Sequence, residues 1–237
     1  MPDAEDRTTY SRALIVGAGA GLSASLARRF TLGGLAISLA ARNTDKLADL
    51  CQETGARAFR CDAADPRAVA DLFAKLDEAD STPDVVVYNA SGRVRGAIET
   101  LDPNSVRDAL LASAQGGFNV AREAAIRMQK SGHGAILFTG ASASVKGYPR
   151  SSPFAMGKFA LRGLAQSLAR ELQPQNIHVA HIAIDGGIAA AGRPIPPEQP
   201  DSLLSPDAIA ETYWHLLKQH RSAWASEIEL RPWVETF

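Results

Sequence analysis

Two short stretches of the sequence combine residue types and spacings that suit chemistry. The turn IVGAGAGLSAS brings Gly17, Gly19 and Gly21 together between an apolar run and a helical pattern. Glycines let a backbone approach a phosphate closely, and the free N–H groups at the start of a helix face an anion. The stretch SSPFAMGKFAL places Lys158 one helical turn after Phe154, and an ammonium is a good donor to several hydroxyl groups. The glycine turn therefore suits the pyrophosphate of a cofactor, whereas most lysines on helices are solvated surface residues, so the spacing alone leaves the role of Lys158 open.

The glycine turn by itself leaves two interpretations open. Its spacing is not a full G-x-G-x-x-G pattern, because Leu22 stands where the last glycine would be. A purely structural turn explains such a spacing about as well as a phosphate cradle does. The strand pattern before the turn and the helix pattern after it favour the cradle.

The elements expected around these stretches alternate along the chain. Helical periodicity separates short apolar runs that predict six buried strands, at 12–17, 35–41, 56–61, 84–90, 134–140 and 177–184. The runs are continuously apolar, which indicates burial on both faces and a parallel sheet. We therefore predict an α/β fold: a doubly wound, Rossmann-like, mostly parallel sheet with helices on both faces. The stretch SEIEL near the end is a candidate seventh strand.

Two long helices are expected beside the second stretch. The first covers 104–128 with one buried stripe, formed by apolar residues 106, 110, 114, 118, 121, 125 and 128. The second starts at Ser152 or Pro153 and ends at Pro174, and Lys158 lies at the border of its apolar stripe.

The chain is expected to form a single domain over 1–237, since it contains no internal repeat and no interior linker. The polar start at 1–11 is predicted to be a loose lead-in. The loop 186–206, with its proline-rich part, is predicted to cover a small-molecule substrate.

Several motifs, in the right order, resemble those of the short-chain dehydrogenase/reductase family. Gly17-x-x-x-Gly21-x-Ser23 resembles the family's glycine motif, with serine for the last glycine. Asp62 in CDAAD resembles the acid that holds the adenine, although it also suits a simple turn cap. Asn89 in YNAS resembles the asparagine of N-N-A-G, and it also suits a role in joining adjacent strands. IHVAHIAIDGG resembles the family's strand that ends in P-G. The two long helices resemble those that pair subunits in the family, which implies a homodimer or homotetramer.

The resemblance implies a cofactor site. The positions that it assigns to cofactor binding are Gly17, Gly19, Ala20, Gly21, Leu22, Ser23, Arg42, Asp62, Ala63, Asn89, Ala90, Lys158, Gly186 and Ile188. At the end of the second strand, an acid would bind the ribose hydroxyls of NAD, but Ala41 stands there and Arg42 follows. A guanidinium matches a 2′-phosphate, so NADP(H) is the preferred cofactor and NAD(H) a possible one. The alternative is that Arg42 only stabilises its loop.

The catalytic positions implied by the resemblance are largely substituted. Phe154 stands at the tyrosine that donates or accepts the proton, and Ala141 at the serine that holds the substrate oxygen. Ser113 stands at the helix asparagine of the water relay. Only Lys158 is kept, so it and Ser142, one residue after Ala141, are the predicted catalytic residues. Further proton sources left open are Tyr148, Ser151, Ser152 and water.

Two functions therefore remain open. The first is an atypical oxidoreductase that transfers a hydride between NADP(H) and a carbonyl or alcohol substrate. Hydride transfer depends mostly on holding donor and acceptor close and aligned. The alternative is a cofactor-binding protein with impaired catalysis, acting as a sensor or as a subunit of an assembly.

Composition and residue spacing also bear on the protein's partners, its location and metal binding. The 237 residues carry a net charge of −1 and no Lys/Arg-rich run, so nucleic acid is not an expected partner. No apolar run reaches the length of a membrane span, which is about 18 residues, so no membrane is expected either. Cys51 and Cys61 are expected to be reduced, and the protein cytoplasmic. The histidine spacings, as in His178 and His181 three apart on a strand, predict no metal site.

Overall fold

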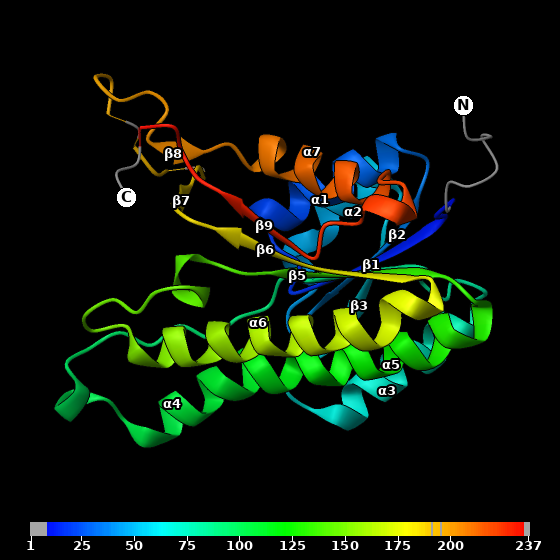
Figure 1. The fold of residues 1–237 in the computed structure, drawn as a ribbon, viewed down its shortest axis with the longest axis horizontal. Helices are drawn as coiled ribbons and strands as arrows, with labels where there is room; N and C mark the ends of the chain where they lie inside the picture. The colour runs from blue at the N-terminus through cyan, green and yellow to red at the C-terminus, as the bar shows by residue number, and fades with distance from the viewer. Residues whose placement is uncertain (1–8, 191, 195, 235–237) are drawn as a thin grey trace.

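The computed structural model describes residues 9–190, 192–194 and 196–234, and shows a parallel sheet between two layers of helices (Figure 1). In these residues the strands of the main sheet are β1 (Arg12–Val16), β2 (Ala36–Ala41), β3 (Arg57–Arg60), β4 (Val85–Tyr88), β5 (Gly134–Thr139), β6 (Ile177–Ile184) and β9 (Glu227–Leu230). Their order is β3-β2-β1-β4-β5-β6-β9, and every neighbouring pair is parallel. The predicted doubly wound α/β fold is confirmed, and SEIEL contributes the edge strand β9.

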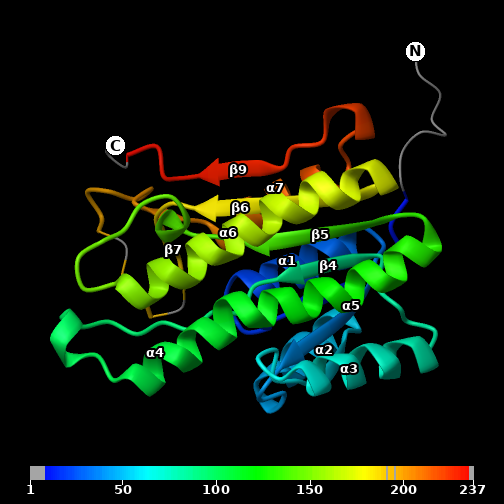
Figure 2. The same ribbon diagram turned by 60° about the horizontal axis from the view of Figure 1, so that its bottom comes forward.

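Helices cover both faces of the sheet, as Figures 1 and 2 show from two sides. One face carries α1 (Leu22–Leu32), α2 (Ala48–Thr54) and α7 (Pro206–Leu217). The other carries α3 (Pro66–Glu78), α4 (Pro103–Leu110), α5 (Gly116–Ser131) and α6 (Ser152–Leu172). The sheet therefore separates two cores, one beneath α1 and α7 and one beneath α3, α5 and α6.

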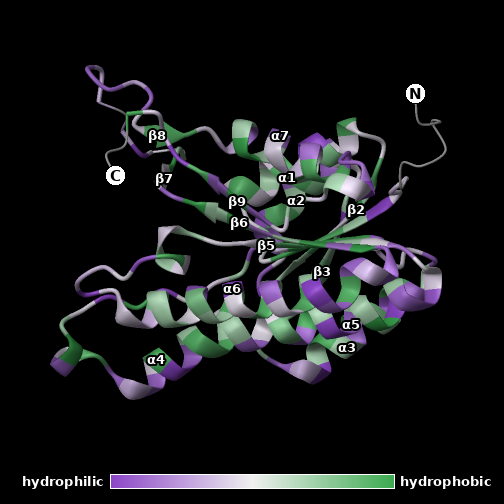
Figure 3. Ribbon diagram, in the orientation of Figure 1, coloured by the Kyte–Doolittle hydropathy of each residue, from purple (hydrophilic) through white to green (hydrophobic). Residues whose placement is uncertain are grey.

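The central strands are mostly apolar because helices cover both of their faces. Every residue of β4, β5 and β6 is buried. Side chains alternate between the two cores, so Ile15 packs beneath α1 while Leu14 and Val16 pack on the opposite side. Figure 3 shows the hydrophobic colour concentrated along the central strands. Continuous apolar runs are thus the expected signature of this sheet.

Local signals set several helix ends. Asp65 caps α3 by accepting from the Arg67 N–H, and Pro66 occupies the first helical position, where its missing N–H costs no hydrogen bond. Asp102 caps α4 and Ser205 caps α7 in the same way. Gly33 ends α1. These caps fix where each helix meets the loops at the sheet edge.

The predicted long helix over 104–128 is interrupted, which corrects its predicted buried stripe. A π-helical turn at Leu111–Gln115 separates α4 from α5. A π turn holds more residues than an α turn, so side chains beyond it rotate around the helix axis. Phe118, predicted to be buried, is 49% exposed, while Gly117 and Val120 face the core instead.

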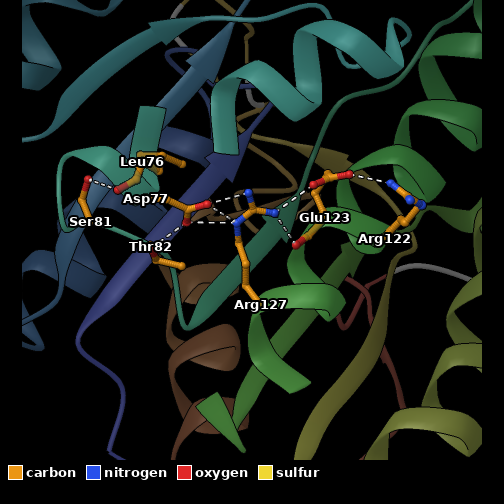
Figure 4. A network of polar contacts seen from close by, with 7 residues as sticks. All are labelled: Leu76, Asp77, Ser81, Thr82, Arg122, Glu123 and Arg127. Carbon is orange, nitrogen blue, oxygen red and sulfur yellow. Dashed lines mark hydrogen bonds and ion pairs between the residues drawn. The ribbon is translucent and has the colours of Figure 1, made fainter. Parts of the chain in front are cut away.

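A charged cluster joins α3 to α5 (Figure 4). The Arg127 guanidinium contacts Asp77 of α3 at 2.6 Å and Glu123 of its own helix at 2.8 Å. Partial burial of Asp77 opposes its ionisation, but hydrogen bonds from Arg127 and Thr82 outweigh this and lower the pKa of its carboxyl. The cluster fixes α5 beside α3, on the helix layer that carries the π turn.

The two predicted loose segments are more ordered at their described ends. Residues 1–8 of the predicted lead-in lie outside the described residues, but the Tyr10 hydroxyl donates to the Gly134 carbonyl and Ser11 bonds to Asp84. The predicted loose lead-in therefore does not extend through Tyr10 and Ser11. In the loop 186–206, β7 (Gly187–Ile188) pairs in parallel with β8 (Leu203–Leu204), so the two ends of this loop are joined. Residues 191 and 195 of that loop also lie outside the described part.

Candidate functional site

The predicted site residues lie along the carboxyl edge of the sheet, where the chain reverses direction. From β1 the chain runs outward to β2 and β3 and then crosses to β4 on the other side of β1. In an open parallel sheet, such a reversal leaves a crevice outside the carboxyl ends of the two strands, and ligands bind there. The glycine turn follows β1 and Asn89 follows β4, so both stand at this crevice.

Gly17 is required by the backbone geometry of the turn. Its φ is +86°, and a Cβ at this position would lie 2.4 Å from the backbone nitrogen of Ala90. The Gly17 N–H donates to the Ala40 carbonyl at 2.9 Å. The predicted residues Gly17 and Ala90 are therefore in direct contact.

The rest of the glycine turn is open. Ala20 and Gly21 are exposed, and a Cβ on Gly21 would meet nothing within 4 Å. Helix α1 begins at Leu22 without a side-chain cap. The Ala24 N–H already donates to the Gly21 carbonyl at 2.9 Å, which leaves the N–H groups of Leu22 and Ser23 for another acceptor. A Cβ on Gly19 would lie 4.0 Å from the Lys46 ammonium, which places a positive charge by the turn. An open backbone, a helix N-terminus and an ammonium fit a phosphate-bearing dinucleotide.

Ser23 and Asn89 tie the turn to β4. The buried Ser23 hydroxyl donates to the Gly17 carbonyl at 3.1 Å, and the Asn89 side-chain amide donates to the Ser23 oxygen at 2.7 Å. The Asn89 backbone N–H also donates to the Val16 carbonyl at 2.8 Å. The structural role foreseen for Asn89 is thus present, and it lies at the crevice itself.

The carboxyl ends of the outer strands carry three more of the predicted residues. Arg42 follows β2, and Asp62 and Ala63 follow β3. Arg42 is exposed directly after β2. The Asp62 carboxylate accepts the N–H of Ala64 at 3.0 Å, which is a turn cap, and its side chain remains exposed. The Ala63 carbonyl accepts the Asn119 side-chain amide at 3.0 Å, so α5 holds this corner in place.

Lys158 is the most deeply buried charged residue of the predicted set. Its side chain lies within α6 and the residue is only 3% exposed, although the sequence predicts a position at the border of the apolar stripe. The ammonium donates to the Thr139 carbonyl at the end of β5, at 2.7 Å. Burial, together with the nearby charge of Arg93, lowers the pKa of Lys158 to about 8. The Thr139 bond uses one of three donors and leaves two for a ligand.

Phe154 lies one turn before Lys158 and stacks against a guanidinium. The Arg93 guanidinium carbon is 4.6 Å from the centre of the phenyl ring, and the Lys158 ammonium is 5.9 Å from it. Both distances suit a cation–π contact. The ring thus holds a positive charge and contributes no proton.

Ser142 contacts a buried carboxylate. It opens a short 3₁₀ turn after Ala141, and its hydroxyl bonds to Asp185 at the end of β6. Asp185 also pairs with Lys146 at 3.2 Å and with Arg231 at 2.7 Å. Burial of Asp185 opposes its ionisation, but these bonds and charges outweigh it and lower the pKa of the carboxyl. Ser142 therefore lies in a polar network, while Ala141 offers only backbone groups.

Ser113 sits in the π turn between α4 and α5. The residue is buried, and its hydroxyl accepts the N–H of Gly92 at 3.0 Å. Gly157 of α6 packs against it, since a Cβ there would come within 2.8 Å of the Ser113 side chain. The π turn thus ties the loop after β4 to α6.

A pocket of about 1130 Å³ joins part of the predicted set. Its lining includes Asn89, Ser142, Lys158, Gly186 and Ile188. The glycine turn, Arg42 and Asp62 are not among the lining residues. The predicted residues therefore fall into a nucleotide end at the glycine turn and a pocket beside α6. Asn89 links the two, because it lines the pocket and bonds to Ser23.

Several pocket residues escaped the sequence interpretation. Arginines line the wall at four positions: Arg93, Arg95, Arg150 and Arg193. Tyr148, left open as a proton source, also lines the pocket, and Lys146 hydrogen-bonds to it. The arginines come from three separate loops, so no local spacing in the sequence marks them as a group.

No group of three or more potential metal ligands gathers in the described residues. His178 stacks on Trp224 with ring centres 4.7 Å apart, whereas His181 bonds to the Ser144 hydroxyl. No helix in the described part of the chain has both the length and the apolar character needed to cross a membrane.

Comparison with known proteins decides the family. A family model described as short chain dehydrogenase matches residues 11–191. The chain belongs to the short-chain dehydrogenase/reductase family. Members of this family use NAD(P), so the predicted class of cofactor is confirmed at that level.

Individual members resemble the chain to different extents. A probable 2,4-dienoyl-CoA reductase from Caenorhabditis elegans is 33% identical over 167 residues, which are 67% of this chain but only 54% of the relative. The crystal structure of a short-chain dehydrogenase from Rhodopseudomonas palustris is 35% identical, with a TM-score of 0.79, and the match covers 94% of this chain and 99% of the other. A metagenomic short-chain oxidoreductase in complex with NADP is 25% identical, with a TM-score of 0.82 over 94% of this chain and 97% of that one.

Proposed function

We propose that this short-chain dehydrogenase/reductase binds NADP(H) and transfers a hydride between it and a small carbonyl or alcohol substrate. One observation carries the proposal: an open glycine turn and the buried ammonium of Lys158 stand at the same sheet edge, linked through Asn89. Burying a lysine without polar partners is costly, because the ammonium loses its hydration. Two ribose hydroxyls would use the two donors that Thr139 leaves free.

The residues at the glycine turn hold the nucleotide end. Backbone N–H groups from Gly19 to Leu22 would bind the pyrophosphate, while Arg42 and Lys46 would provide charge for a 2′-phosphate. This charge supports NADP(H) over NAD(H). Asp62, at the turn after β3, remains available to the adenine because only one of its oxygens is used in the cap.

The nicotinamide, when bound, would supply or accept the hydride. A group of the chain, or water, would donate the proton in carbonyl reduction and accept it in alcohol oxidation. Phe154 takes the position of the family's tyrosine, so the proton has to come from another group. Tyr148 and Ser142 are the two candidates, since both line the pocket and each has a charged partner, Lys146 or Asp185. Loss of a positioned acid typically costs about a hundred- to ten-thousandfold in rate, so turnover is expected to be slow.

The second candidate function is cofactor binding without turnover, in a sensor or a subunit of an assembly. It is favoured by Phe154, which stands at the position of the family's proton donor. The ring contacts the Arg93 guanidinium and has no proton to donate. The residues of the nucleotide end are the same in both cases. Only activity separates the two functions.

A homodimer or homotetramer is part of the same proposal. Phe118 of α5 and Met156 and Phe159 of α6 are about half exposed. Large apolar side chains that gather on one surface often mark a contact between subunits. Neighbouring positions on α5 and α6 thus support pairing through these helices.

The test combines binding with turnover. Purified protein is titrated with NADPH and then assayed with aldehydes and ketones. We expect saturable binding with slow turnover, and Phe154→Tyr should raise the rate about a hundredfold by restoring an acid. Tyr148→Phe and Ser142→Ala identify the present donor, with Ser167→Ala, an exposed residue of α6, as the matched control. Binding with no turnover in any of these proteins supports the second function, and absence of binding rejects both.

A further inference from the structure

The pocket beside α6 has an unusually one-sided charge. Its lining contains the guanidinium groups of Arg93, Arg95, Arg150 and Arg193 together with the Lys158 ammonium. The described residues that line it include no aspartate and no glutamate. The chain as a whole carries a net charge of −1, so this concentration of positive charge is local.

Contacts with the surrounding structure position two of the four guanidinium groups, those of Arg93 and Arg193. The Arg93 guanidinium lies over the Phe154 ring, which fixes its plane. The Gly96 N–H donates to the Arg150 carbonyl at 3.1 Å, so the two loops that carry arginines are joined. Arg193 donates to the Ile188 carbonyl at 3.2 Å and lies against Gly187, where a Cβ would come within 2.3 Å of the guanidinium.

None of these four arginines forms an ion pair with a carboxylate of the described residues. Arginines elsewhere do so, as the pairs Arg28–Glu53 and Arg162–Glu227 show. The nearest buried acid, Asp185, is already neutralised by Lys146 and Arg231.

The positive charges of the pocket repel one another, and water screens part of this repulsion because all four arginines are solvent-exposed. Partial burial, together with repulsion by Arg95 and Arg193, lowers the pKa of Arg93. An anion relieves such repulsion, and a guanidinium offers two parallel donors that match a carboxylate or a phosphate. The same positive charges that repel one another would therefore attract an anionic ligand.

We propose that the substrate is an anion whose carboxylate or phosphate group binds Arg93 on the Phe154 ring, between Arg95 and Arg193. This inference rests on the proposed function in one respect, namely that the pocket beside α6 is the substrate site. It also gives the phenylalanine a positive role, because the ring positions the guanidinium that recognises the substrate.

The test is a calorimetric titration of the full chain saturated with NADP⁺. Saturation matters because the cofactor's own phosphates are then already bound. The probes are malonate, inorganic phosphate and uncharged malonamide. We expect malonate or phosphate to bind saturably and malonamide not to bind. Tighter binding of phosphate assigns a phosphorylated substrate and tighter binding of malonate a carboxylic acid, and either result supports the proposal.

Variants make the test specific to the Arg93 cluster. Loss of a charged hydrogen-bond donor should weaken anion binding about tenfold or more in Arg93→Gln. Arg193→Gln provides a second variant if Arg93→Gln is poorly folded. Arg57→Gln is the matched control, because Arg57 also stacks on a phenylalanine, at 5.3 Å from the Phe59 ring, but on the edge strand β3 away from the pocket.

The outcomes separate this inference from the proposed function. Three results would overturn the inference. The first is binding of malonamide as tight as that of malonate, and the second is anion binding that Arg93→Gln and Arg193→Gln leave unchanged. The third is loss of anion binding once NADP⁺ is saturating, which would mean that the arginines hold the cofactor's phosphates instead. NADPH titration of the same preparations reports on the proposed function alone. Normal NADPH binding without anion binding overturns only the inference, whereas Arg93-dependent anion binding without NADPH binding rejects the proposed cofactor and keeps the anion site.

Discussion

The two ends of the crevice use different parts of the chain to make a site. At the glycine turn, backbone atoms form the surface: Gly21 has open space around it and α1 has no side-chain cap. Beside α6, side chains form the surface, with the buried Lys158 and the Phe154 ring under a guanidinium. Both ends stand at the carboxyl edge of the same sheet, and Asn89 connects them.

This difference indicates which end can change without loss of the fold. A backbone cradle tolerates few substitutions, because any side chain fills the space that the phosphate needs. A pocket made of side chains can exchange an acid for a phenyl ring and still remain a pocket. We therefore expect substitutions at the glycine turn to affect the cofactor, and substitutions beside α6 to affect the proton and the substrate.

The largest effect is expected from Gly21→Ala. A Cβ there meets no atom of the protein within 4 Å, so the fold should not be destabilised. It would occupy the place of the pyrophosphate, and a displacement of that size can cost about a hundredfold in affinity for NADPH. Gly163→Ala is the control, because this exposed glycine of α6 also has open space around it. Equal NADPH affinities in the two variants would show that no phosphate approaches the turn.

A smaller effect is expected from Lys158→Met. Removing a charged donor to two hydroxyls should weaken NADPH binding roughly ten- to thirtyfold. The lowered pKa of Lys158, about 8, adds a second readout: affinity in the wild type should fall as pH rises through that value, and the variant should lack this fall. Lys75→Met, on the exposed side of α3, serves as the control. A wild-type affinity that is flat between pH 7 and pH 9, with a normal affinity in the variant, contradicts a ribose contact.

A selective effect is expected from Arg42→Ala. The guanidinium is exposed, so the loss for NADPH should be about tenfold, and NADH should lose little. Increasing salt should narrow the difference between wild type and variant. Equal losses for both cofactors would mean that Arg42 stabilises its loop and does not select the 2′-phosphate.

The smallest effect concerns stability beside α6, where the ionisable groups are buried. Burial lowers the pKa of His181 to about 4, and the charges of Lys158 and Arg162 act in the same direction against that of Glu227. The folded state thus keeps His181 neutral while the unfolded chain takes up a proton near its ordinary pKa. The free energy of unfolding should fall as pH drops from about 6.5 to about 4, by on the order of 1 to 3 kcal/mol.

Denaturant unfolding of His181→Gln across this range checks the assignment. The variant should lose that part of the pH dependence and keep the part below pH 4.5. There Glu227, whose pKa is lowered to about 2 chiefly by the hydrogen bond from Arg162, becomes protonated in the unfolded chain. An unchanged profile between pH 6.5 and 4.5 would assign the loss to other groups.

The fold was predictable because its signals are local. Continuous apolar runs marked the strands, and Asp65 with Pro66 marked the start of α3. The glycine turn was predictable for the same reason, since adjacent residues build it. The open N-terminus of α1 follows from the same short stretch.

What sequence could not predict depends on contacts between distant segments. The π turn leaves no local mark, so Phe118 was placed in the core although it is exposed. Full burial of Lys158 depends on packing of α6 against β5, and the arginine cluster depends on three loops meeting at one wall. In each case the spacing along the chain carried no information about the spacing in the fold.

The central claim is that the glycine turn and Lys158 bind the two ends of one NADP(H) molecule. Calorimetric titration of the wild-type chain with NADPH at neutral pH tests it most directly, with Gly21→Ala and Lys158→Met measured alongside. The account predicts saturable binding at one site per chain, weakened in each variant. Absence of any heat or saturation with NADPH and with NADH, or affinities that neither variant changes, would contradict it.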